Sequence, residues 1–101
     1  MRKRTKQLMK VVFKITYPNG KIYVGQDVTD DATFFGNPDR ALIERDFTRA
    51  QRHKFTITKK ILWKSRKATH TEVSAVKREC VTRLRSNNPK IGYNKIPKFK
   101  G

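Results

Sequence analysis

Apolar and polar residues alternate along a short stretch near the start of the chain. Phe13, Ile15 and Tyr17 are separated by polar residues, which is the period of a half-buried strand. Pro18-Asn19-Gly20 follows, and Asn and Gly tolerate the positive φ of tight turns. A second apolar run, Ile22-Tyr23-Val24, comes next. The pattern predicts an antiparallel hairpin.

The middle of the chain carries two helix-start signals in succession. Asn37-Pro38 supplies an N-cap residue followed by proline at the first helical position. We therefore expect a helix over residues 39–47, with apolar contacts that include Phe47. A capping box begins at Thr48, which predicts a break there and a short second helix to about residue 53.

Residues 54–63 alternate again and predict a third strand. Phe55, Ile57, Ile61 and Trp63 have one parity, and Lys59 is the exception to the pattern.

The clearest helix comes last, and it begins with a capping box at Thr69. Its apolar residues recur at helical spacing and form one stripe: Val73, Val76, Cys80, Val81 and Leu84. Asn87-Asn88-Pro89 is expected to end it.

The order of elements is thus strand, strand, helix, helix, strand, helix. It predicts an α+β fold, a small three-stranded antiparallel sheet flanked by helices. With 101 residues there is room for one domain, which we place at residues 11–94. Residues 1–10 are interpreted as a flexible basic arm and residues 95–101 as a basic tail.

The net charge of the chain indicates which kind of molecule it binds. The chain has 25 Lys and Arg against 8 Asp and Glu, a formal net charge of +17. Self-repulsion on this scale weakens a compact state, so a polyanion is the expected partner, and nucleic acid is the natural one. We expect DNA rather than RNA, with a protein partner or homo-oligomer left open. The basic arm is either a solvated tail or a further phosphate contact.

Cysteine use and hydropathy bear on the compartment. Cys80 is the single cysteine, so neither an intrachain disulfide nor a zinc site built on several cysteines can form. Cys80 lies on the apolar stripe and is interpreted as a core residue. No run is long and apolar enough to span a bilayer. We expect an intracellular, reducing, cytoplasmic location and no membrane partner.

Several residues together resemble the GIY-YIG nuclease superfamily, in the manner of its short stand-alone phage and bacterial members. Tyr23-Val24-Gly25 matches the second half of the name motif, and Gly92-Tyr93-Asn94 matches a C-terminal landmark. The helix that bears Glu79 lies at the matching separation. The resemblance covers about residues 11 to 94. It implies an endonuclease that hydrolyses DNA phosphodiester bonds with a single divalent ion, Mg²⁺ or Mn²⁺, and little sequence specificity.

The first half of the motif departs from the family. Its tyrosine, which in the family helps to handle the attacking water, aligns with Phe13, and phenylalanine has no hydroxyl. Tyr17 has the same strand parity as Phe13 and is a candidate substitute, although it lies four residues along, about 13 Å on an extended strand.

The resemblance implies roles for three further residues, each with a structural alternative. Glu79 would hold the metal ion; alternatively it pairs with a neighbouring Lys or Arg, for instance Arg83 at i+4. Tyr23 would activate or orient water, with its pKa lowered by surrounding cations; alternatively its ring is packed on the core. Asn94 would support the site or contact phosphate; alternatively it is a turn residue.

An arginine of the first helix would stabilise the transition-state phosphate. Arg45 is our first choice because it lies deeper in the helix, and Arg40 is the second. The polar insertion of residues 26–37, which precedes this helix, shifts the register and leaves both open. His53 is a candidate general base, although a surface histidine is more often inert. Contacts with the nucleic-acid backbone are expected from five basic residues: Lys21, Arg49, Arg52, Lys59 and Lys60.

Three functions compete for this pattern. A metal-dependent endonuclease is the first, and a GIY-YIG-like module that binds nucleic acid but is catalytically impaired through Phe13 is the second. A small RNA-binding protein of ribosomal type is the third, and it leaves the placement of Glu79 and Asn94 unexplained.

Overall fold

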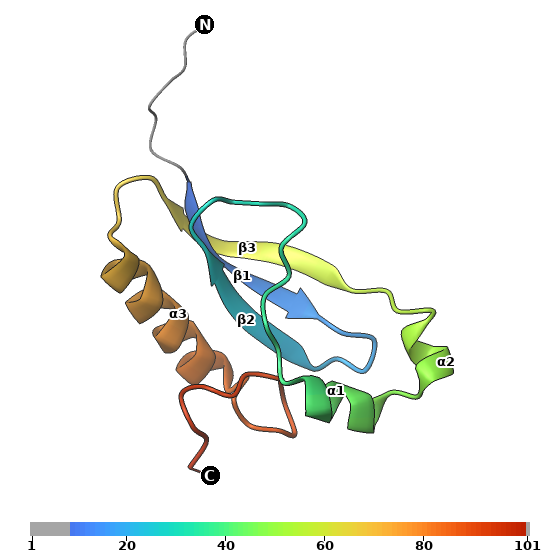
Figure 1. Cartoon of the computed structure of the whole chain (residues 1–101). Helices are drawn as coiled ribbons and strands as arrows, with labels where there is room; N and C mark the ends of the chain where they lie inside the picture. Colours follow the sequence, from blue (N-terminus) through green and yellow to red (C-terminus); the bar gives the residue numbers. More distant parts are fainter. Residues whose placement is uncertain (1–8, 101) are drawn as a thin grey trace, which may run out of the picture.

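The computed structural model describes residues 9–100 and contains six elements (Figure 1). Strands β1 (Lys10–Thr16), β2 (Ile22–Asp27) and β3 (Thr58–Ser65) form one antiparallel sheet in the order β2-β1-β3. The helices are α1 (Arg40–Asp46), α2 (Arg49–Arg52) and α3 (His70–Leu84). The predicted α+β fold and its element order are confirmed. Most of the predicted N-terminal arm, residues 1–8, and Gly101 of the predicted tail lie outside the described residues.

The sheet separates two apolar clusters. Helix α3 covers one face, where Val12 and Val24 of the strands pack against Val73, Cys80 and Val81 of the helix. The loop of residues 28–39 passes over the opposite face (Figure 1).

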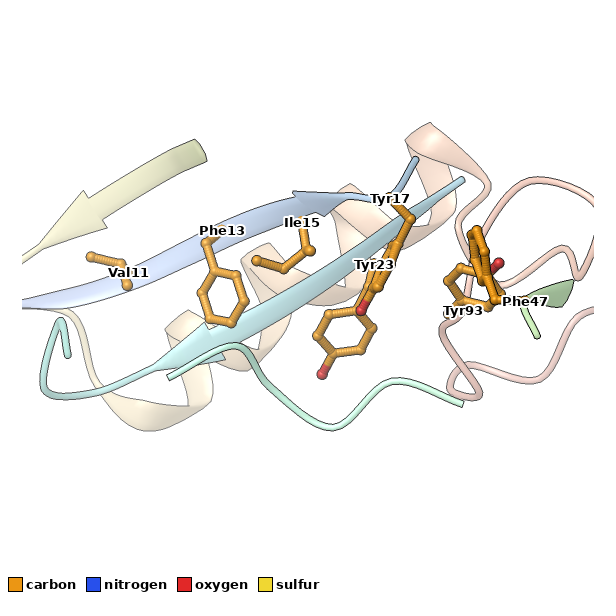
Figure 2. Close-up of a cluster of buried hydrophobic side chains, with 7 residues drawn as sticks. All are labelled: Val11, Phe13, Ile15, Tyr17, Tyr23, Phe47 and Tyr93. Carbon is orange, nitrogen blue, oxygen red and sulfur yellow. The ribbon is translucent and has the colours of Figure 1, made fainter. Parts of the chain in front are cut away.

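Aromatic residues dominate the cluster on that opposite face (Figure 2). Its buried members come from β1, β2, the end of α1 and the C-terminal segment: Val11, Phe13, Ile15, Tyr17, Tyr23, Phe47 and Tyr93. The ring centroids of Tyr17 and Tyr93 lie 5.0 Å apart, and those of Phe47 and Phe55 lie 4.8 Å apart, both edge to face. Such pairs add stabilisation beyond the burial of their area.

Three predicted boundaries were wrong. Helix α1 is capped by Asp39, whose side chain accepts a hydrogen bond from the Leu42 amide, and not by Asn37. Strand β3 begins at Thr58 instead of residue 54, because β1 offers no partner beyond its pairing of Thr16 with Thr58. Helix α3 ends at Leu84, followed by Arg85 in the left-handed conformation, so it stops before Asn87.

The capping boxes at Thr48 and Thr69 are confirmed. The alternation predicted for the third strand is interrupted by a β-bulge. Val12 pairs with Trp63 and Phe13 with Ile61, so Leu62 is the additional residue of β3. The bulge turns Trp63 toward the α3 side of the sheet, where it packs on the second cluster.

No helix among residues 9–100 is long and apolar enough to cross a bilayer.

Candidate nucleic-acid interface

Tyr23 lies on β2, and its side chain extends toward the loop of residues 28–39 (Figure 2). Its side chain is buried, and its hydroxyl oxygen accepts a hydrogen bond of 3.0 Å from the Asn37 amide. Gly36 has a φ of +79°, and a Cβ there would overlap the Tyr23 ring and lie 2.8 Å from its hydroxyl oxygen. The loop can close on the phenol only because residue 36 has no side chain.

The pKa of the Tyr23 hydroxyl is raised, contrary to the expectation that cations lower it. Burial disfavours the phenolate and is the largest cause, and the hydrogen bond from the Asn37 amide opposes it only in part. The phenol therefore stays protonated at neutral pH, where it can donate a hydrogen bond to an anion.

Asn94 supports β2 with both ends of its side-chain amide. Oδ1 accepts a 2.8 Å hydrogen bond from the Val24 amide, and Nδ2 donates one of 2.8 Å to the Val24 carbonyl. The adjoining chain also pairs with β2, through a parallel bridge between Ile22 and Gly92. Asn94 thus supports the strand that carries Tyr23, and its role in a functional site stays a prediction.

A cavity of about 270 Å³ lies beside the Tyr23 side chain. Its lining comes from β2, the loop, α3 and the C-terminal segment: Tyr23, Asn37, Lys77, Asn94, Lys95 and Ile96. Burial lowers the pKa of the Lys77 ammonium. An anion in the cavity would favour the charged form of that lysine.

The α3 side chain that reaches this cavity is thus Lys77 rather than Glu79. Residues two positions apart in an α-helix, such as Lys77 and Glu79, are separated by about 200° around its axis. Glu79 therefore points to the side opposite Lys77. Glu79 is exposed, and within residues 9–100 it forms no ion pair with Arg83, whose guanidinium lies 3.5 Å from the sulfur of Cys80. Glu79 therefore does not line the Tyr23 cavity, where a metal ligand is expected, and it forms no ion pair with a Lys or Arg among the described residues.

The arginines of α1 are both exposed and both paired with carboxylates. Arg40 Nε lies 3.4 Å from Glu44, and Arg45 Nε lies 3.2 Å from Asp46. A larger cavity, of about 560 Å³, adjoins the first and shares Asn37 and Lys95 with it. Arg40 lines that cavity and Arg45 does not. The geometry reverses the order of preference between the two.

Phe13 is fully buried, and the Lys59 ammonium lies 4.5 Å from the centroid of its ring. Gly25 is required opposite it, since a Cβ there would lie 2.5 Å from the tip of the Phe13 ring. Tyr17 does not replace the missing hydroxyl at this position, because it packs against Tyr93 at the other end of the cluster. Burial, and secondarily Tyr23, raises its pKa to about 12.

His53 caps the end of α2, is exposed, and does not line the Tyr23 cavity. The structure therefore gives no support to its assignment as a general base.

Two of the five residues expected to contact the nucleic-acid backbone bind other parts of this chain. Lys21 Nζ lies 2.6 Å from Asp46 and 2.9 Å from the Pro89 carbonyl. Lys59 Nζ donates to the carbonyls of Asp31 and Phe34 and so holds the loop on the sheet. These two lysines bind other parts of the chain, and their contact with a nucleic-acid backbone stays a prediction.

The other three expected contacts remain accessible to different degrees. Arg49 and Lys60 are exposed. Arg52 lines the larger cavity while it donates to the Phe47 carbonyl.

Sequence reasoning missed Lys77, although a signal was present. Val73 and Val81 lie four residues on either side of it, so Lys77 falls on the buried side of α3. The ammonium group of a lysine there must reach a polar or solvated space, and the cavity provides one. Lys95 carried no comparable signal, because its place depends on the path of the chain after Asn94.

The residues around Tyr23 do not fit a magnesium or manganese ion. Such hard cations take oxygen ligands, carboxylates above all. The cavity is lined by two lysines and by no carboxylate. Within the described part of the chain, no group of three or more His, Cys, Asp or Glu side chains could hold a metal ion.

Comparisons with protein-family models, with curated proteins and with solved structures found no match to this chain. The resemblance to GIY-YIG nucleases stays a prediction from the motif residues.

Proposed function

We propose that this protein binds nucleic acid, DNA in preference to RNA, and does not cleave it. The observation that carries the proposal is the side chain that α3 directs to the Tyr23 cavity. A phosphodiesterase of the implied kind needs a carboxylate there to hold its metal ion. Lys77 occupies that place, and its charge repels a cation and attracts a phosphate.

The surroundings of Lys77 support a phosphate-binding role. Lys95 adds a second positive charge to the cavity. Arg52 and Arg40, the latter paired with Glu44, line the adjoining one. The protonated Tyr23 hydroxyl is a further hydrogen-bond donor. With a net charge of +17, long-range attraction brings the phosphate backbone to this surface without base discrimination.

The metal-dependent endonuclease is the second candidate, and one observation favours it. Tyr23, Asn94 and the cavity that Arg40 lines lie around neighbouring spaces, as the GIY-YIG resemblance implies. The exposed carboxylate of Glu79 would have to supply the metal ligand from the other side of α3.

Binding is tested by fluorescence anisotropy with a labelled DNA duplex and its RNA counterpart over a series of salt concentrations. We expect the logarithm of the affinity to fall linearly with the logarithm of the salt concentration. Lys77→Gln should weaken binding and reduce the slope by about one. Lys64→Gln is the matched control, because it removes an exposed lysine from β3, at the far edge of the sheet. If the natural chain bound neither the DNA nor the RNA duplex, the proposal would be refuted.

Cleavage is tested by nicking of supercoiled plasmid in Mg²⁺ or Mn²⁺. We expect the natural chain to leave the plasmid intact, and Glu79→Ala to do the same. Nicking by the natural chain that disappears in Glu79→Ala would replace the proposal with the endonuclease. Stronger binding to RNA than to DNA would instead favour the third candidate, an RNA-binding protein.

A further inference from the structure

Ile96 is the most exposed of the large hydrophobic side chains in the described part of the chain. Its exposed fraction is 73%, against 42% for Phe35, 41% for Phe99 and 40% for Ile61. A single exposed aliphatic residue is ordinary on a protein surface. Ile96 is distinguished by the basic residues and cavities around it.

Ile96 stands between two cavities that share Lys77. One is the Tyr23 cavity described above, and the other has a volume of about 160 Å³. The lining of the second cavity comes from β2, α3 and the C-terminal segment: Gln26, Ser74, Lys77, Arg78, Ile96 and Pro97. Apart from the adjoining Pro97, the side chains around this apolar tip are basic or polar.

The backbone on both sides of Ile96 is fastened to the rest of the domain. Before it, the Asn94 amide makes its two hydrogen bonds with Val24. After it, Nδ2 of Asn87 donates a 2.7 Å hydrogen bond to the Pro97 carbonyl. Holding the tip in place before binding reduces the entropy lost when a partner covers it.

We propose that Ile96 is an apolar wedge that enters the minor groove of duplex DNA and partly unstacks one base step. The inference rests on the proposed binding function and specifies how the duplex is held. Aliphatic side chains inserted between base steps kink DNA in this manner. Ile96 has no aromatic plane on which an unpaired base could stack, which favours the duplex over a single strand.

The charges beside the wedge fit this partner. Lys95, Lys98 and Arg78 are exposed, and Lys77 lies between the two cavities. They can neutralise the phosphates on either side of an opened step, and this favours DNA over an apolar protein surface.

The test uses duplexes that carry 2-aminopurine, whose fluorescence rises when the base is unstacked. With the natural chain we expect a clear rise on saturation. With Ile96→Ala we expect no rise and an affinity about ten- to fiftyfold lower, as for the lost burial of one aliphatic side chain. The slope against salt should stay unchanged, because no charge is removed.

Ile61→Ala is the matched control, since it shortens an exposed isoleucine on β3, at the far edge of the sheet. It should retain both the natural affinity and the fluorescence rise. Normal binding without any rise for the natural chain would overturn the wedge and leave the binding function intact. The wedge is equally overturned if Ile96→Ala behaves as the natural chain does. Failure of the natural chain to bind DNA at all would refute the binding function itself.

Discussion

Asp46, the last residue of α1, connects three distant parts of the fold. Its carboxylate lies 2.6 Å from Lys21 Nζ and accepts a 2.7 Å hydrogen bond from the Tyr93 hydroxyl. The Tyr93 hydroxyl in turn accepts one of 2.9 Å from the Asn19 side chain in the hairpin turn. We predict that Asp46→Asn destabilises the protein, because it removes the charge that these donors surround.

The magnitude follows from the pKa of the carboxyl group. The hydrogen bond from Lys21 is the main cause that lowers the Asp46 pKa from 3.8 to about 2, helped by Tyr93 and Arg45 and opposed by burial. Such a change corresponds to at most about 2 kcal/mol of folding stability. Solvent screening at this position near the surface reduces the expected value to between about 1 and 2 kcal/mol.

The sign of the pH dependence is fixed by the lowered pKa. The stabilisation is fully present above 3.8, the pKa in the unfolded chain, and is lost as the pH falls toward about 2, the pKa in the folded protein. The natural chain should therefore exceed Asp46→Asn in stability at neutral pH. The difference in stability between the two chains should nearly vanish as the pH approaches 2.

Urea unfolding of both chains over this pH range measures the difference. Asp30→Asn is the control, because it removes the same charge from an exposed loop residue. A stability difference between the natural chain and Asp46→Asn that did not change with pH would refute the reasoning. So would an Asp30→Asn variant with the same pH dependence as Asp46→Asn.

Two further predictions concern β2. Asn94→Ala should lower the free energy of unfolding by about 2–3 kcal/mol, because the Val24 amide and carbonyl both lose their partner. Asn94→Asp keeps only an acceptor, so its stability in urea should lie between those of the natural chain and Asn94→Ala. An unchanged midpoint in Asn94→Ala would contradict the strand-supporting role. Gly25→Ala should cost about 1–3 kcal/mol, because the new Cβ meets the Phe13 ring. Thermal unfolding measures it, and an unaltered transition would show that the ring moves aside freely.

Sequence alone predicted the elements whose signals are local. The hairpin turn at Asn19-Gly20 and the capping boxes at Thr48 and Thr69 are read from a few neighbouring residues. The start of β3 was missed for the opposite reason. Phe55 and Ile57 alternate as strand residues do, but pairing depends on where β1 ends.

The candidate site was harder to predict than the fold. Helical spacing predicted the apolar stripe of α3, yet it could not tell which residue beside the stripe, Glu79 or Lys77, lies near Tyr23. That depends on the C-terminal segment, which brings Lys95 and Asn94 to the side of Lys77. The pairing of Lys21 with Asp46 was equally hidden, because the two residues meet only in the tertiary structure.

The two edges of the sheet differ in a way that bears on aggregation. An open strand edge is a template for pairing with other chains. The edge of β2 is covered at Ile22 and Val24, where the Gly92 bridge and the Asn94 side-chain amide occupy its hydrogen-bonding groups. The edge strand β3 instead carries Lys60 and Lys64, exposed charges that repel a second copy. Loss of the Gly92–Asn94 segment would leave a bare strand edge, and fibrous self-association would be its consequence.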